Sequence, residues 1–486
     1  HRTNNCVVIP IRNGSHLIYN RLLNNPIVLD SDSFAFFMSL TFITFPLTLS
    51  EDKHELVIFL IENGYFFKEE TDESTILKNS HTKHLSDLSS GKTLVALDLR
   101  ISEKCNFGCK HCIVGQSEKS KPLMKEQMAI DAVNAFMACS KTGGIDLHFG
   151  NAEPFLNFNV LQATYNHLNE HYPDAEKRVS VNTNLSLLNE AKAQFLTQSG
   201  ITTYVSLDGE KPANDAIRIF KKGGVGTYDV VMEKMSLLEK YGHPIEGISV
   251  TATDQNYQFF GPNFIDWCHT RGYTSLGFDF DLINPLSISV DERVEILHSM
   301  WIRAEELGME FFGTWMTPFI NITSKSIMQE EYAFCKGIHG RAISIDGDGQ
   351  IHICGYSDTM LGHFSKLHES IQPGGKLYAL VESRLVGNVS HCHGCEIEGA
   401  CAGQCYATCE SSQQKASEQC IFYRKVTKKF LETYAGMEES WHYIIQKGGD
   451  NHGFPQAQSS PRCFHAVEAS ELLLISPWKW MGFSKF

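Results

Sequence analysis

Basic residues are in the minority in this sequence. Its 486 residues include 42 Lys and Arg against 56 Asp and Glu, which gives a formal net charge of -14. Such a charge argues against a general nucleic-acid binder and against a protein held on a membrane by a cationic surface. The composition is also unlike that of a disordered protein, because 42% of the residues are hydrophobic and 11% are aromatic. We therefore expect a folded chain of two or three domains.

Long apolar runs are scarce as well. Residues 33–50 form one stretch of 18 residues without a charge, which is at the lower limit for crossing a bilayer. The stretch contains Pro46 and five Ser or Thr residues besides Ser33, and no Lys or Arg bias flanks it. We expect a buried helix and strand there, and no membrane contact. The first residues do not form a secretory signal, so we expect a reducing cytoplasm in which thiols persist as ligands.

Cysteines, by contrast, are abundant. The chain has 15 of them, and ten fall in two dense sets. A small secreted disulfide scaffold would be much shorter, so metal binding explains these sets better. Cys6, Cys139, Cys268 and Cys463 are isolated. Cys139 and Cys268 lie in helical patterns, where buried and inert thiols are the expected state.

The chain divides by pattern into four segments. Residues 1–90 show a hairpin followed by winged-helix-like elements, and the polar stretch 69–92 is typical of a linker. Residues 91–325 alternate strands and helices as six βα units, which predicts an α/β fold with a partial (β/α)6 TIM-like barrel. Residues 326–430 are cysteine-rich and loop-rich, so metal clusters are expected to replace a hydrophobic core there. Residues 431–486 are expected to form a C-terminal helix and a tail of unknown role.

Chemistry in such a barrel lies at the carboxyl ends of the strands. The strands are expected within six segments: 94–101, 145–149, 178–183, 202–207, 247–252 and 275–280. In the cysteine-rich segment, an Asp-Gly turn between two alternating runs predicts a hairpin over residues 342–354.

The first cysteine set follows the first barrel strand directly. Cys105, Cys109 and Cys112 have CxxxCxxC spacing, so three thiolates on one loop can hold three irons of a [4Fe-4S] cluster and leave the fourth iron open. Zinc is the alternative, but a structural zinc site needs four protein ligands, and His111 beside Cys112 is poorly placed to be the fourth.

This motif resembles that of the radical S-adenosylmethionine (SAM) superfamily, and the resemblance covers about residues 94–310. It implies that the open iron binds the amino and carboxylate groups of SAM, whose reductive cleavage yields a radical that abstracts hydrogen from the substrate. The family's Gly-Gly-Glu-Pro motif stands here as Asn151-Ala152-Glu153-Pro154, and Glu153 is expected to accept from the ammonium of the cofactor.

Further strand ends match the same family. Asn182 and Asn184 lie in a segment that resembles the one facing the ribose, and Ser206 and Asp208 belong to a Ser-Leu-Asp-Gly match. The resemblance also implies that Arg218 pairs with the cofactor carboxylate; an exposed arginine on a helix face is the alternative.

The second cysteine set resembles the SPASM extension of some radical SAM enzymes, which holds two auxiliary [4Fe-4S] clusters. Seven cysteines match in order: Cys335, Cys354, Cys392, Cys395, Cys401, Cys405 and Cys420. By family analogy, Cys392, Cys395, Cys401 and Cys420 complete one cluster, and Cys335, Cys354 and Cys405 supply three ligands to the other. Sulfatase-maturing relatives have a further cysteine where this chain has Arg341, so either Cys409 closes that site or one iron is open.

The resemblance implies three [4Fe-4S] clusters, SAM, and a one-electron reductant such as flavodoxin or ferredoxin. The leading hypothesis is a maturase that installs a thioether or carbon–carbon crosslink in a ribosomally made precursor peptide, whose leader binds the N-terminal segment. An anaerobic sulfatase maturase that forms formylglycine is the second hypothesis. A non-radical iron–sulfur or zinc redox or regulatory protein is the third.

Overall fold

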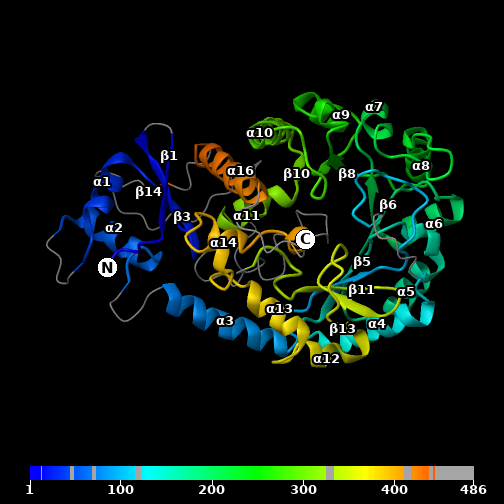
Figure 1. Ribbon diagram of the computed structural model, residues 1–486, viewed down its shortest axis with the longest axis horizontal. Coiled ribbons are helices and arrows are strands. Elements are labelled where there is room, and N and C mark those ends of the chain that lie inside the picture. Colours follow the sequence, from blue (N-terminus) through cyan, green and yellow to red (C-terminus); the bar gives the residue numbers. More distant parts are fainter. Residues whose placement is uncertain are drawn as a thin grey trace.

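A computed structural model describes most of the chain. The described residues are 1–11, 14–43, 49–67, 73–114, 122–323, 333–409, 418–436 and the strand 442–443. In Figure 1 the N-terminal unit and the barrel lie at opposite ends of the molecule, and the cysteine-rich segment lies between them. The cysteine-rich segment therefore has the N-terminal unit on one side and the barrel on the other.

The N-terminal unit has the predicted order of elements. Its antiparallel strands β1 (Cys6–Pro10), β2 (His16–Asn20) and β3 (Asn24–Leu29) are followed by helices α1 (Ser31–Ser39) and α2 (Glu51–Glu62). A short strand β14 (His442–Tyr443) pairs in parallel with β3. The unit has its own buried core: Ile18, Ile27, Leu29, Phe37, Leu56, Leu60, Tyr65 and Phe66.

Within the described residues, the uncharged stretch 33–50 is helical only over residues 33–39. It begins within α1, which is nine residues long, and no helix of the described residues is long and apolar enough to cross a membrane. The expected strand is not present in the described part of the stretch, and residues 44–48 lie outside it. Its apolar side chains include the buried Phe37 of the small core.

The predicted linker is wrong, because most of it forms helix α3 (Glu73–Ser89). Leu77, His84, Leu85 and Leu88 are buried at helical spacing, so the polar composition concealed an amphipathic face. α3 packs against α13 (Lys376–Arg384) of the cysteine-rich segment, as Figure 1 shows. The segment between the first two units is thus part of the core.

The barrel contains every predicted strand. The parallel strands are β4 (Ala96–Leu99), β5 (Gly144–Phe149), β6 (Glu176–Thr183), β7 (Thr202–Ser206), β8 (Gly247–Ala252) and β9 (Ser275–Phe280). The main helices between and after them are α4 (Glu126–Cys139), α5 (Phe158–His171), α6 (Glu190–Ser199), α8 (Tyr228–Lys240), α9 (Pro262–Thr270) and α10 (Val290–Leu307). A further short strand, β10 (Glu310–Phe312), pairs with β9 and was not predicted. Within the described residues the sheet stays open, as expected for a partial barrel.

The cysteine-rich segment extends the same sheet. The predicted hairpin is confirmed as β11 (Ala342–Ile345) and β12 (Gln350–His352), and β13 (Gly362–His363) pairs with β12. β11 pairs in parallel with β4, so the hairpin continues the barrel sheet beside the strand that leads to the first cysteine set. This long-range pairing could not be read from the local pattern.

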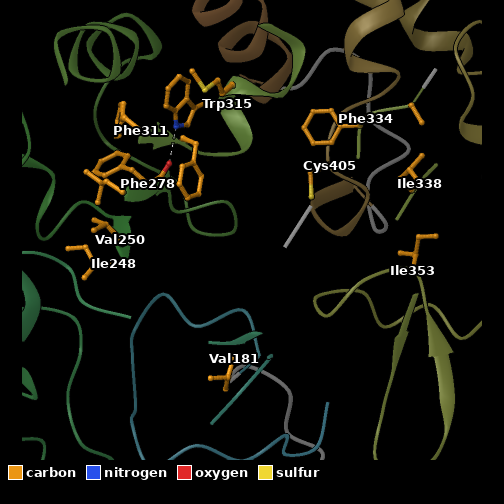
Figure 2. Packing of buried hydrophobic residues seen from close by; sticks show 14 of the residues in the cluster. Val181, Ile248, Val250, Phe278, Phe311, Trp315, Phe334, Ile338, Ile353 and Cys405 are labelled. Atoms are coloured by element: carbon orange, nitrogen blue, oxygen red, sulfur yellow. Dashed lines mark hydrogen bonds between the residues drawn. The ribbon is translucent and has the colours of Figure 1, made fainter. Parts of the chain in front are cut away.

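The segment also has apolar residues of its own, contrary to the expectation that clusters alone replace its core. Phe334, Ile338 and Ile353 are buried in the same cluster as Val250 and Phe278 of the barrel (Figure 2). Helices α11 (Thr317–Thr323), α14 (Glu398–Cys401), α15 (Tyr406–Cys409) and α16 (Glu418–Ala435) complete the segment. One continuous core thus fixes the cysteine-rich segment on the barrel.

Candidate active site

A cavity of about 200 Å³ lies at the carboxyl ends of the barrel strands. This is where a parallel sheet places its chemistry. The cavity brings together ten of the predicted site residues: Cys105, Cys109, Cys112, Asn151, Ala152, Asn182, Asn184, Ser206, Arg218 and Cys405. Glu153 and Asp208 are not among the lining residues and lie behind the wall.

The first cysteine loop is anchored to a segment that follows α7 (Lys211–Asp215). The backbone N–H of Gly108 donates to the carbonyl of Ile219 at 2.7 Å, and the rings of Phe107 and Phe220 meet edge to face at 5.0 Å. Burial raises the pKa of the Cys105 thiol to about 12. A cationic ligand such as iron would offset the cost of ionising such a thiol.

Arg218 faces the same loop and is not an exposed helix-face residue. It is only 7% exposed, and its guanidinium forms a bidentate ion pair with Asp208 at 2.6 and 2.9 Å. Asp208 is fully buried and also accepts from the backbone N–H of Thr251 at 2.8 Å. Burial raises the pKa of Cys109 to about 11, and the nearby Arg218 opposes this rise. Asp208 therefore orients Arg218, which lines the cavity.

Glu153 does not reach the cavity in the way the motif suggested. Its buried carboxylate accepts from the Thr183 hydroxyl at 2.6 Å, the Asn184 N–H at 2.7 Å and the Phe155 N–H at 2.9 Å. Burial raises its pKa, and these hydrogen bonds lower it. Asn184 in turn contacts the Cys105 sulfur at 3.5 Å. In this structure Glu153 ties the end of β6 to the loop after β5.

Two polar atoms in the cavity lack partners among the described residues. They are Asn151 Oδ1 and Ser249 Oγ, and both are buried. Buried polar atoms are normally hydrogen-bonded, so this pair suits a polar ligand that contributes the missing groups. Asn151 has a φ of 84°, where the family motif has glycine, and Asn is among the residues that tolerate this conformation. The lost glycine is thus compatible with the same turn.

Sequence reasoning missed several lining residues, among them Ser249, Thr251, Asp279 and Tyr356. Asp279 lies near the end of β9, and its Oδ1 accepts from the Thr314 N–H at 2.7 Å and the hydroxyl at 2.6 Å. The strand-end rule could have found Ser249, Thr251 and Asp279. Tyr356 comes from the cysteine-rich segment, so no local signal places it in the cavity.

Comparison with known proteins agrees with this geometry. Residues 99–258 match the Radical SAM superfamily. These residues form a radical SAM domain, and the chain is a radical SAM enzyme. SAM and a [4Fe-4S] cluster are therefore the cofactors of this domain, and the third hypothesis of a non-radical protein is wrong.

Similar proteins extend over more of the chain. The radical SAM cyclopropyl synthase TigE of Paramaledivibacter caminithermalis is 19% identical over 403 residues, which cover 78% of this chain and 83% of that protein. Native anSMEcpe with bound AdoMet superposes with a TM-score of 0.54 at 18% identity, covering 70% of this chain and 97% of that one. Streptococcus suis SuiB bound to precursor peptide SuiA gives a TM-score of 0.53 at 17% identity, covering 85% and 97%. These likenesses to solved structures concern the fold.

Beyond the radical SAM domain, the structure brings one group of four cysteines close together. Burial raises the pKa of Cys392 to about 12 and also raises the pKa values of Cys395 and Cys401, and nearby thiols of the group, Cys420 among them, add to the rise. Cys420 lies on α16, and Phe430 of that helix packs against Trp301 with their ring centroids 4.5 Å apart. A donor set of four thiols suits an iron–sulfur cluster.

The remaining cysteines of the second set lie nearer the cavity. Cys335 and Cys405 interact, and burial raises the pKa of Cys335 to about 12. Cys405 lines the radical SAM cavity itself. The Cys354 carbonyl accepts from the Arg100 guanidinium at 2.5 Å. The side chain of Cys409 lies outside the described residues, so the fourth ligand of this site stays open.

No group of three or more His, Cys, Asp and Glu side chains within the described ranges is placed to hold a single metal ion. The ligands of one zinc ion converge at about 2.3 Å from it. In a cubane each thiolate binds a different iron, so the sulfurs lie further apart. This finding therefore concerns single ions.

The isolated cysteines are mostly shielded. Cys268 is buried and Cys139 is half-buried, and burial raises the pKa of both. Burial also raises the pKa of Cys6 on β1 to about 12, whereas Cys463 lies outside the described residues. These raised pKa values make Cys6, Cys139 and Cys268 poor nucleophiles.

Proposed function

We propose that the chain is a peptide maturase that installs an oxidative crosslink, such as a thioether or carbon–carbon bond, in a ribosomally made precursor. The observation that carries the proposal is the placement of Cys405, from the second cysteine set, in the same cavity as Cys105, Cys109 and Cys112. An auxiliary site beside a radical site suits a reaction that forms a radical on a substrate and then removes an electron from it.

The first cysteine loop would hold one [4Fe-4S] cluster, and the second set would hold two more. Bound at the open iron of the first cluster, SAM supplies the abstraction of a hydrogen atom from the substrate. Asn151 Oδ1 and Ser249 Oγ would bind polar groups of SAM, because both are buried in the cavity without a partner. Arg218, oriented by Asp208, would bind its carboxylate. Glu153 would act through Asn184 as a positioning residue rather than by direct contact.

The N-terminal unit favours a precursor peptide over a sulfatase as the substrate. The fold likeness to SuiB, a protein solved with its precursor peptide, covers 85% of this chain, whereas anSMEcpe accounts for 70%. We infer that a leader binds the N-terminal unit as an added strand. Formylglycine formation is the second candidate, since anSMEcpe has also been solved with a Cys-containing peptide, Cp18Cys. We place the protein in the cytoplasm, with a flavodoxin or ferredoxin as electron donor, because reduced clusters need a reducing compartment.

The test takes short peptides translated from open reading frames beside this gene as candidate substrates and incubates them with the anaerobically reconstituted enzyme, dithionite and SAM. The proposal expects 5′-deoxyadenosine and a peptide that has lost two hydrogen atoms by mass spectrometry. The same peptide without its leader should show a KM raised by about tenfold or more, equivalent to about 1.4 kcal/mol. An unmodified peptide, with conversion of a sulfatase-derived Cys or Ser peptide to formylglycine, would favour the second candidate.

One measurement shows whether Cys409 closes the proposed site of Cys335, Cys354 and Cys405 or whether one iron there is open. If Cys409 is its fourth ligand, Cys409→Ala should lose about one cluster's iron, four atoms per chain. If the iron is open, the iron content should stay unchanged, and a Cys-containing peptide should perturb the spectrum of the auxiliary cluster.

A further inference from the structure

The turn between β2 and β3 of the N-terminal unit lies directly on the loop that carries Cys392, Cys395 and Cys401. The backbone N–H of Gly399 donates to the Arg21 carbonyl at 2.6 Å. The Asn24 side chain donates to the Gly399 carbonyl at 3.3 Å. These partners are about 375 positions apart in sequence, so only the tertiary fold brings them together.

Gly399 is required for this approach by space alone. A Cβ at this position would lie 2.4 Å from the Leu22 carbonyl oxygen and 2.8 Å from that of Arg21. Both contacts are with backbone, which cannot move aside as the end of a flexible side chain can. Any larger residue at position 399 would therefore push the turn away from the loop.

A buried ion pair adds to the backbone contacts. Arg21 Nη1 bonds to Glu398 Oε2 at 3.2 Å, and the Glu398 side chain is only 3% exposed. The same Oε2 accepts from the N–H of Gly394, which lies between Cys392 and Cys395, at 3.1 Å. On its own side Arg21 is held by Asn5 Oδ1 at 2.8 Å. A chain of polar contacts thus runs from Asn5, just before β1, to the cysteine loop.

We propose that the Arg21–Asn24 turn is a structural part of the site of Cys392, Cys395, Cys401 and Cys420, and that it positions the first three of these ligands. If Arg21 were removed, Glu398 would be left buried and without its charge partner, which is strongly destabilising for the local structure. Because the intact turn belongs to the N-terminal unit, we expect peptide binding to that unit to change the environment of this cluster.

The inference rests on the proposed function in one respect, the presence of an auxiliary cluster at these cysteines. The experiment compares full-length Gly399→Ala and Arg21→Gln, reconstituted anaerobically, with two matched controls. Gly261→Ala adds a Cβ where nothing lies within 4 Å, and Arg303→Gln removes a surface ion pair with Asp266 at 2.7 Å. The readouts are iron and sulfide per chain, the EPR spectrum of the reduced clusters, and 5′-deoxyadenosine formed without peptide.

Both junction variants should lose about four irons per chain or show an altered auxiliary EPR signal. Peptide-independent SAM cleavage should stay within about twofold of the controls, because the radical SAM cavity is not touched. Arg21→Lys, which keeps the charge, should retain more of the cluster than Arg21→Gln. If circular dichroism shows that Gly399→Ala is unfolded, the comparison of Arg21→Gln with Arg21→Lys decides the question.

Iron content and EPR spectra in both junction variants equal to those of the controls would overturn the inference. Failure of the proposed function would look different: the wild-type protein would leave the peptide unmodified, while its iron content and the variant series could still be measured.

Discussion

The two cysteine regions are held in different ways. The Cys105 loop is fixed by barrel neighbours, such as Ile219 at the Gly108 N–H and Asn184 at the Cys105 sulfur. The Cys392–Cys401 loop is instead held from outside, by the Arg21 turn of the N-terminal unit. The first cysteine loop is thus fixed within the radical SAM domain, whereas the Cys392–Cys401 loop depends on contacts with another unit of the chain.

Arg100 connects the two regions. It follows β4, is 2% exposed, and donates to Ser344 Oγ at 3.0 Å and to the carbonyls of Cys354 and Ser357 at 2.5 and 2.9 Å. β4 leads to Cys105, and β12 leads to Cys354. One buried guanidinium therefore holds the base of the first cysteine loop against the loop that contains Cys354.

The largest effect is expected from the first region alone. Replacing Cys105, Cys109 and Cys112 together by Ala should abolish 5′-deoxyadenosine formation, because no ligand then positions the open iron. About eight irons per chain should remain if the auxiliary sites are independent. If this triple variant cleaved SAM at the wild-type rate, the assignment of radical chemistry to the first region would be wrong. If it lost all of its iron, the two cysteine regions would not be independent of each other.

Breaking the connection should affect both regions. Arg100→Gln leaves three acceptors short of a donor and should destabilise the protein by about 2–4 kcal/mol. It should also shift the EPR signal of the cluster at Cys354, which the surface variant Arg303→Gln should not do. Denaturation and EPR on the same samples check both, and an unchanged spectrum would show that Arg100 has only a structural role.

Helix α3 provides a purely structural comparison. Leu88 is fully buried where α3 meets the cysteine-rich segment, so Leu88→Ala should cost about 2–5 kcal/mol of unfolding free energy. The exposed Leu156 is the control, and Leu156→Ala should change stability by about 0.5 kcal/mol or less. Equal effects in chemical denaturation would mean that α3 is the linker suggested by its composition.

The smallest effect is expected at the far edge of the sheet, on β10. Burial raises the pKa of Glu310 to about 7, and a bond from Ser275 opposes the rise. The folded state then binds more protons than the unfolded state between the ordinary pKa of 4.5 and about 7, so stability should fall as pH rises through this window. Glu310→Gln should flatten that dependence without changing the iron content. A slope unchanged from wild type in pH-dependent denaturation would contradict it.

The difference between the regions also explains what the sequence could predict. CxxxCxxC spacing after the first barrel strand predicted Cys105, and the resemblance to the radical SAM family implied Asn151 and Arg218; all three line the cavity. Tyr356, Arg21 and Arg100 act across hundreds of positions, and no periodicity announces such contacts. Helix α3 was missed because its few apolar residues are spread among polar ones. Glu153 was placed by its motif, but its hydrogen bonds with Thr183 and Asn184 depend on the neighbouring strand.

The most direct test asks whether the radical formed in this cavity reaches a peptide. The reconstituted enzyme is incubated with SAM, dithionite and a perdeuterated form of the short peptide encoded beside this gene, and the 5′-deoxyadenosine is analysed by mass spectrometry. The account predicts deuterium in 5′-deoxyadenosine together with a peptide that has lost two of its hydrogen isotopes. Unlabelled 5′-deoxyadenosine with an intact peptide would contradict it.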